Sequence, residues 1–165
     1  MFKMNFKKII PDTLIVLTIF LMDRIFKIYI LKIAELEEKV DIYINSFLNF
    51  YLIWNKGIAF GLLSFDKIII YQLISLIIFT ISVVLIFMII KSEGLKKYSL
   101  ISILGGALGN LFDRIYYSAV PDFIDLHFNG FHWFIFNLAD IFITIGVICL
   151  ILDELIFYKK NNETK

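Results

Sequence analysis

The run at 68–90 constrains the fold most, because it is strongly apolar and contains no charged side chain. About 20 such residues cross the ~30 Å hydrocarbon core of a bilayer as a helix. Three further apolar runs lie at about 13–31, 98–112 and 134–158, and 60% of the whole chain is hydrophobic, which is high for a soluble domain. The sequence therefore predicts an all-α integral membrane protein, a four-transmembrane-helix bundle forming a single membrane domain over 1–165.

The first apolar run is interpreted as a retained helix and not as a cleaved signal peptide. Pro11 and Asp12 precede it and are typical of a helix N-terminus. No small-x-small cleavage site follows the run, and three charged residues interrupt it instead: Asp23, Arg24 and Lys27.

The distribution of Lys and Arg predicts the orientation in the membrane. Three segments, the N-terminus, the 91–97 loop and the C-terminal tail, together hold nine positive residues. The two longer loops at about 32–67 and 113–133 hold five and are richer in acids. Because cytoplasmic segments carry the excess of positive charge, both termini are predicted to be cytoplasmic, with both long loops on the outer face.

The first outer loop contains a predicted strand. From Leu48 to Trp54, every second position holds a Leu, Phe or Trp side chain, which is a period of two. Asn55-Lys56-Gly57 follows as a turn. The loop is also rich in aromatic residues, which favour a membrane interface. We therefore expect a small periplasmic β-sheet or loop element at the outer face of the helix bundle.

Polar and ionisable side chains gather at the outer ends of three of the four runs. Such groups are costly at membrane depth and mark functional sites. The members of this cluster are Asp23, Lys27, Asn110, Asp113, Arg114, Asp122, Asn137 and Asp140. The third run is short, which would draw its polar end into the membrane, and the spacing of Gly105 and Gly109 favours a close helix contact.

Asp122 and Asp140 are the candidate catalytic pair. Two carboxylates that meet in a low-dielectric site cannot both stay ionised, so they tend to share one proton. The ionised member can then take a proton from water while the protonated member polarises a peptide carbonyl. The sequence does not assign these two roles to individual residues, because the pair titrates as a unit.

Other members of the cluster have structural interpretations. Asp23 and Lys27 are spaced to form an ion pair within the first helix. Asp113 and Arg114 are expected either to neutralise each other or to contact substrate.

Four residues outside the cluster are interpreted without a function. Asp125 is expected to be a solvated loop acid, and His127 and His132 to be interface residues, because they lack a His-Glu-x-x-His pattern. Cys149, the single cysteine, lies inside an apolar run and is interpreted as a packing residue.

Five short motifs occur in order along the chain. They are Asp-x-x-x-Lys (Asp23, Lys27), Asn-x-Gly-x-Ala-Phe (Asn55, Gly57, Ala59, Phe60), Gly-Gly-x-x-Gly-Asn-x-x-Asp-Arg (Gly105, Gly106, Gly109, Asn110, Asp113, Arg114), Val-x-Asp-Phe (Val120, Asp122, Phe123) and Phe-Asn-x-Ala-Asp (Phe136, Asn137, Ala139, Asp140). Each motif is weak alone. Together, over nearly the whole chain, they make the sequence resemble the lipoprotein signal peptidase (signal peptidase II) family.

The resemblance implies an aspartic-type endopeptidase of the bacterial inner membrane, with Asp122 and Asp140 as catalytic residues. It implies cleavage of prolipoprotein signal peptides before a diacylglyceryl-modified cysteine. We also expect membrane lipids as partners and a monomeric chain. No metal or organic cofactor is implied. The residues implied to bind substrate or support the pair are Asp23, Lys27, Asn55, Gly57, Asn110, Asp113, Arg114, Asn137 and Ala139.

Four positions depart from the family pattern. Ser118 stands where the family usually has Gly, Arg24 where it usually has Gln, and Phe134 where it often has Pro. Pro121 replaces an apolar residue beside Asp122, and its fixed φ and missing N–H predict altered geometry there.

Two other classes of function fit parts of the sequence. A proton- or ion-translocating protein also needs membrane carboxylates, but here the polar groups gather at one face. A non-catalytic assembly or lipid-binding subunit would tolerate Asn in place of Asp122 and Asp140. The net charge of +1 gives no reason to expect nucleic acid as a partner.

Overall fold

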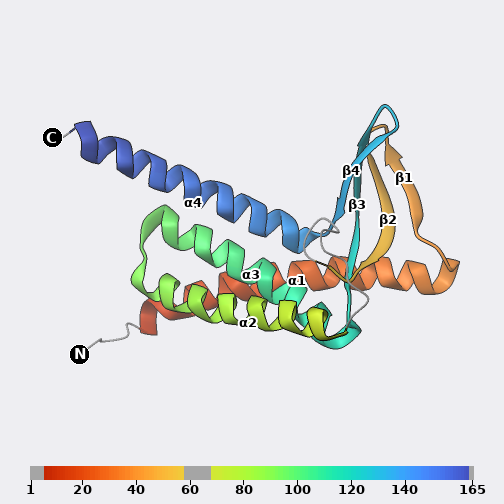
Figure 1. Cartoon of the computed structure of the whole chain (residues 1–165), viewed down its shortest axis with the longest axis horizontal. Helices are drawn as coiled ribbons and strands as arrows, with labels where there is room; N and C mark the ends of the chain where they lie inside the picture. Colours follow the sequence, from red (N-terminus) through yellow and green to blue (C-terminus); the bar gives the residue numbers. More distant parts are fainter. Residues whose placement is uncertain (1–5, 58–67, 164–165) are drawn as a thin grey trace.

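The computed structural model describes residues 6–57 and 68–163, which form four helices and a four-stranded sheet (Figure 1). The helices are α1 (Phe6–Glu37), α2 (Ile68–Lys91), α3 (Gly94–Tyr117) and α4 (Leu138–Glu163). The strands are β1 (Asp41–Asn45), β2 (Leu48–Asn55), β3 (Val120–Phe128) and β4 (Phe131–Phe136). The motif residues Ala59 and Phe60 lie outside the described residues.

The sheet is antiparallel with the order β1-β2-β3-β4, and it stands at the end of the helices away from both termini (Figure 1). The strand predicted over 48–54 is confirmed as part of β2. No strand was predicted in the second long loop, which forms the β3–β4 hairpin. Asn129 and Gly130 connect the two strands with positive φ angles of 49° and 79°, as the favoured two-residue hairpin turn requires.

Helix α3 lies at the centre of the bundle and contacts each of the other three helices. Glycines allow this close packing. A Cβ on Gly109 would lie 2.7 Å from a carboxylate oxygen of Asp23 in α1, and one on Gly106 would clash with the carbonyl oxygen of Ala139 in α4. The close contact predicted at Gly105 and Gly109 is confirmed, because both positions face α1.

Three helix boundaries differ from the sequence prediction. Helix α3 is not short, because Asp113 and Arg114 are buried and paired inside it and do not end it. Pro11 lies inside α1 and not at its start. The fourth helix begins at Leu138, because the residues around Phe134 belong to β4.

Two of the departures from the family pattern have a structural explanation. Ser118 follows α3 with φ 56° and ψ 23°, the left-handed conformation that glycine adopts most readily at a helix end. Pro121 lies in the first part of β3, which pairs with β2, whereas pairing with β4 starts at Ile124. A missing N–H is tolerated where a strand has one neighbour.

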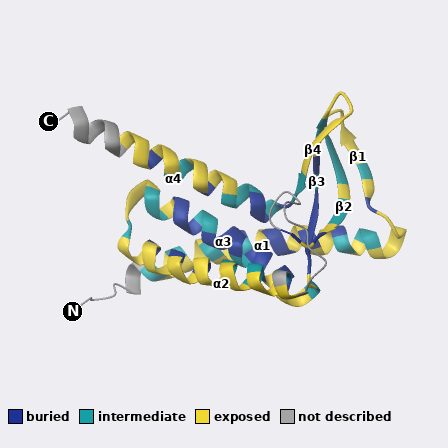
Figure 2. Ribbon diagram, in the orientation of Figure 1, coloured by how far each residue is buried: buried dark blue, intermediate teal, exposed yellow. Residues whose placement is uncertain are grey.

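Many large apolar side chains are exposed on the helices. The buried residues lie mainly along α3 and β3 and in the middle of α1 (Figure 2). By length and composition alone, one helix in the described part of the chain qualifies as a membrane span, over Tyr71–Lys91. Helix α1 carries more charge, but its Asp23, Arg24 and Lys27 are all buried. A buried cluster of Ile30, Val40 and Phe123 joins α1 to the sheet.

Candidate active site

Two aspartates are buried where the sheet meets the helices. Asp122 lies in β3 and Asp140 in the first turn of α4, and their exposed fractions are 1% and 4%. Seven of the nine residues predicted to support them contribute a polar side chain to one hydrogen-bond network, and the other two, Gly57 and Ala139, join it through their backbones.

Asn137 and Asp140 together cap the N-terminus of α4. The backbone N–H of Asp140 donates to Oδ1 of Asn137 at 3.1 Å, and the N–H of Asn137 donates to Oδ2 of Asp140 at 3.2 Å. This is the reciprocal arrangement of a capping box, in which two otherwise unpaired N–H groups are satisfied. The N–H of Ala139 donates to Asp23 at 3.0 Å. The chain therefore holds the Asp140 carboxyl through the start of its own helix.

Asp122 accepts hydrogen bonds from two side-chain amides. Nδ2 of Asn55 lies 2.9 Å from one carboxyl oxygen, and Nδ2 of Asn137 lies 2.6 Å from the other. Burial, and then the negative charge of Asp140, raise the pKa of Asp122 to about 7 in spite of these donors. Asn137 therefore contacts both carboxyl groups, donating its side-chain amide to one and its backbone N–H to the other.

Asn110 connects Asp140 to a buried lysine. Its Nδ2 donates to Oδ1 of Asp140 at 2.8 Å, while its Oδ1 accepts from Nζ of Lys27 at 2.9 Å. Because an ammonium group can only donate, Lys27 fixes which end of the Asn110 amide faces Asp140. Lys27 is fully buried, and its position thus determines the donor that Asp140 receives.

Lys27 and Arg24 pair with two aspartates from different helices. Lys27 Nζ lies 2.8 Å from Asp23 and 2.6 Å from Asp113, and Arg24 lies 3.1 Å and 2.6 Å from the same two acids. The predicted Asp23–Lys27 ion pair is confirmed. Two positive and two negative charges balance, which a buried ionic group requires.

Mutual neutralisation of Asp113 and Arg114 is not what the structure shows. Asp113 pairs with α1, whereas the guanidinium of Arg114 donates to the carbonyl oxygens of Gly57 at 2.9 Å and Asn110 at 3.3 Å. Arg114 therefore attaches the segment after β2 to the end of α3. The N–H of Gly57 in turn donates to Asn55 at 2.8 Å, so the donor to Asp122 is fixed in place.

Asp125 is not a solvated loop acid. It is 3% exposed, and both its carboxyl oxygens lie within 3.1 Å of Nδ1 of His132. Burial and this contact follow from the β3–β4 pairing, which the sequence analysis did not anticipate.

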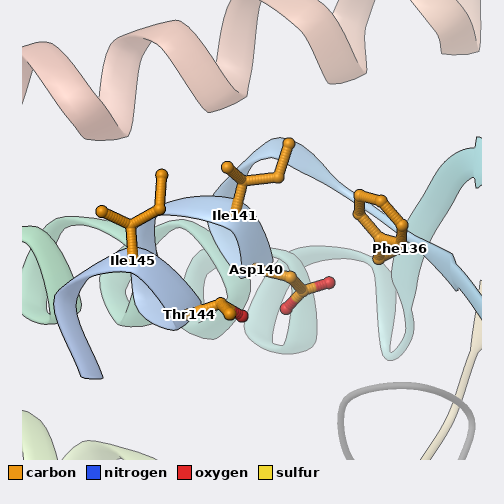
Figure 3. A pocket seen from close by; sticks show the side chains of 5 residues that line it. All are labelled: Phe136, Asp140, Ile141, Thr144 and Ile145. Carbon is orange, nitrogen blue, oxygen red and sulfur yellow. The ribbon is translucent and has the colours of Figure 1, made fainter. Parts of the chain in front are cut away.

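A cavity of about 240 Å³ lies beside Asp140. Figure 3 shows its lining, in which Ile141 and Ile145 project to one side of α4 and the Asp140 carboxyl to the other. Phe136 and Thr144 complete the lining. The surface of this cavity is apolar.

Sequence reasoning missed two features of this site. Arg24 was noted as a departure from the family and not as a partner of Asp113. The capping role of Asn137 was also missed, although an Asn followed three residues later by an acid before an apolar run is a signal for a helix N-terminus.

Comparison with known proteins gives one consistent result. A family model described as Signal peptidase (SPase) II matches residues 15–156. The lipoprotein signal peptidase of Pelagibacter ubique (strain HTCC1062) is 58% identical over 98% of both chains. That of Anaplasma phagocytophilum (strain HZ) is 38% identical over 90% of this chain and 94% of its own.

A solved structure described as a bacterial membrane enzyme agrees in fold. It matches with a TM-score of 0.76 and 31% sequence identity, over 100% of this chain and 96% of its own. A second structure with the same description has a TM-score of 0.71 over 88% of this chain and 92% of its own. The chain belongs to the signal peptidase II family of aspartic-type lipoprotein signal peptidases.

Proposed function

We propose that Asp122 and Asp140 are the catalytic pair with which this chain cleaves prolipoproteins before a diacylglyceryl-modified cysteine. The observation that carries the proposal is the position of Asn137, which donates to both carboxyl groups at once. Neither carboxyl has a hydrogen bond or ion pair with a cation in the described part of the chain. Two buried acids with neutral partners are suited to share one proton.

The shared proton gives the pair its chemistry. The ionised carboxylate accepts a proton from a water molecule, which attacks the scissile carbonyl, while the protonated carboxyl donates to the carbonyl oxygen. The proton then passes to the leaving amine as the peptide bond breaks. Asn55, Asn110 and Asn137 hold the two carboxyls in position through the contacts described above.

The four helices are proposed to span the bacterial inner membrane. Many large apolar side chains are exposed on their outer surfaces, and the charged residues near the sheet end of α1 and α3 are buried: Asp23, Arg24, Lys27, Asp113 and Arg114. Buried and paired charges do not meet lipid, so they do not prevent these helices from spanning. Both termini lie at the end opposite the sheet (Figure 1), and the positive-inside rule makes that end cytoplasmic. The pair of Asp122 and Asp140 then faces the outer leaflet.

The substrate and the apolar cavity suit each other. A signal peptide and the acyl chains of a lipidated cysteine are apolar and would reach the site from within the bilayer. The cavity beside Asp140 is lined by Phe136, Ile141 and Ile145, which can contact such groups. Membrane lipids and the prolipoprotein are the proposed partners, and the proposed working unit is a monomer. No cofactor is part of the proposed mechanism.

The test is cleavage of a diacylglyceryl-modified prolipoprotein by the full chain in detergent. Mass spectrometry of the products locates the cut relative to the lipidated cysteine. Asp122→Asn and Asp140→Asn should each lower kcat by at least about 10³-fold, because each removes a proton-transfer group. Asp41→Asn, at an exposed carboxyl on β1, is the matched control and should keep the wild-type rate.

Helical circular dichroism and monodisperse elution establish that each variant is folded. Near-normal cleavage by either folded variant would contradict the assignment of the pair, and it would return the ion-relay and binding alternatives. Cleavage at another bond would contradict the proposed substrate.

A further inference from the structure

Three side chains that can bind a metal meet on the β3–β4 hairpin, away from the catalytic pair. They are Asp125 and His127 in β3 and His132 in β4. The strand register places His127 directly opposite His132, and their rings stack with centroids 5.2 Å apart. We propose that these three residues bind one divalent transition-metal ion, and that zinc is the ion they fit.

The distances between the ligand atoms suit a small ion. One ligand atom from each of the three side chains can be chosen so that all lie within 4.8 Å of one another. An Asp125 oxygen lies 2.8 Å from Nδ1 of His132 and 3.8 Å from Nδ1 of His127. Zinc bonds of about 2.0–2.1 Å in a tetrahedron place ligand atoms about 3.3 Å apart. No separation between two ligand atoms therefore has to change by more than about 1.5 Å.

The bonding state of His127 favours a metal ligand over a simple ion pair. Its Nδ1 is buried and has no hydrogen-bond partner in the part of the chain that the structure describes. A pair between Asp125 and His132 alone leaves that nitrogen unsatisfied, which is costly for a buried polar atom. Oδ1 of Asn49, the residue opposite Asp125 on β2, is also buried without a described hydrogen-bond partner. A metal ion provides a partner for Nδ1 of His127. A water molecule bound to the ion can donate a hydrogen bond to an acceptor such as Oδ1 of Asn49.

Burial and ligand type identify the class of ion. The Asp125 side chain is 4% exposed, whereas that of His132 is 58% exposed, so an ion has an entry path and a solvent-facing position. Two imidazoles and one carboxylate are the ligands of zinc sites that keep an open position. Calcium and magnesium prefer sites made entirely of oxygen.

A metal ion here ties the two strands of the hairpin together. Asp125 follows the catalytic candidate Asp122 by three residues in the same strand, so the ion would steady that strand. The metal ligands and the residues that contact Asp122 are different side chains. Zinc binding and peptidase activity are therefore separate claims that can fail independently.

The experiment uses the full chain without a polyhistidine tag, purified in detergent and treated with a chelator. Titration calorimetry with zinc chloride near pH 7.5 should show one bound ion per chain. His132→Gln and His127→Gln should each weaken binding by at least about 100-fold, more than the effect of losing an outer-shell partner. Cys149→Ala and Asp41→Asn are the controls, and both should bind zinc as the wild type does.

Thermal unfolding provides a readout that does not depend on activity. Saturating zinc should raise the melting temperature of the wild type, because the ion binds the folded state. It should not raise that of His132→Gln, whose altered side chain is exposed and leaves the fold intact in the absence of metal.

Two outcomes would overturn the site. One is the absence of stoichiometric zinc binding by the wild type. The other is His127→Gln binding zinc as tightly as the wild type, because a pair formed by Asp125 and His132 alone predicts that result.

Discussion

Two groups of buried aspartates lie side by side in one hydrogen-bond network, and they differ in their partners. Asp23 and Asp113 contact Lys27 and Arg24 at 2.6–3.1 Å. The Asp122 and Asp140 carboxyls instead accept hydrogen bonds from asparagine amides and a backbone N–H. The acids are of the same type and are similarly buried, so their different partners are the basis for the different roles that we propose for them.

The comparison teaches how one fold separates support from reactivity. A carboxylate beside a cation gains an opposite charge that counters its loss of hydration, and such a pair holds helices together. A carboxyl beside neutral donors keeps the tendency to bind a proton, which a proton-transfer group needs. Asn110 joins the two groups, since its oxygen faces Lys27 and its amino group faces Asp140.

The largest expected effect on stability comes from removing Lys27, one of the two cations that the supporting acids share. Lys27→Met leaves buried negative charge uncompensated and should cost about 3–5 kcal/mol. Unfolding by a denaturing detergent measures this cost. Lys39→Met is the matched control, because Lys39 pairs with Asp41 at 2.6 Å on an exposed surface and should change stability little.

A Lys27→Met variant as stable as Lys39→Met would contradict the proposed contrast between the two groups of aspartates. It would mean that Asp23 and Asp113 do not depend on their cations.

The second effect concerns the pH dependence of stability at Asp122. The pKa of this group is raised to about 7 by burial and by Asp140, whereas an unfolded aspartate titrates near 3.9. Between these values the folded chain holds a proton that the unfolded chain has lost. Stability therefore falls as the pH rises, by about 2–3 kcal/mol between pH 5 and pH 7.

Asp122→Asn should remove most of this dependence on pH, whereas Asp41→Asn should leave it unchanged. Unfolding measured at several pH values separates the two variants. Parallel curves for the wild type and Asp122→Asn would mean that Asp122 titrates normally, and the contrast between the two groups of acids would then be lost.

The smallest effect on stability is expected at the residue that joins the pair. Asn137→Ala removes the helix cap on Asp140 and a donor to Asp122; loss of the cap costs about 0.5–2 kcal/mol. Activity should fall by about 100-fold, because both carboxyls lose a positioning contact.

Asn45→Ala is the control for the asparagine that joins the pair, since Asn45 accepts from a backbone N–H at 2.9 Å in an exposed turn. It should keep full activity. Equal activity of the two alanine variants would show that the bridge between the carboxyls does not matter.

Much of the architecture could be predicted from local patterns. Four apolar runs identified the four helices, and the period of two identified β2. The helix ends were less accurate, because Asp113 and Arg114 are polar in sequence yet continue α3 through contacts with distant segments. The β3–β4 hairpin was missed, although Asn129-Gly130 between two strand-like segments is a strong hairpin signal.

The candidate site was predicted as a set of residues and not as a network of contacts. Spacing alone identified the Asp23–Lys27 pair because both lie in one helix. The Lys27–Asp113 pair joins residues 86 positions apart, and no local pattern contains that information. The burial of Asp125 likewise depends on strand register, which requires knowing that β3 and β4 pair.

The most direct test of the shared proton is the dependence of kcat/KM on pH for cleavage of the lipidated prolipoprotein. This parameter reports the ionisation of the free enzyme. A pair that works with one proton predicts a bell-shaped profile, whose alkaline limb falls near pH 7 as the last proton leaves the pair, because the pKa of Asp122 is raised to about 7. A rate that keeps rising through about pH 9 would contradict the account, since both carboxyls would then be ionised in the active enzyme.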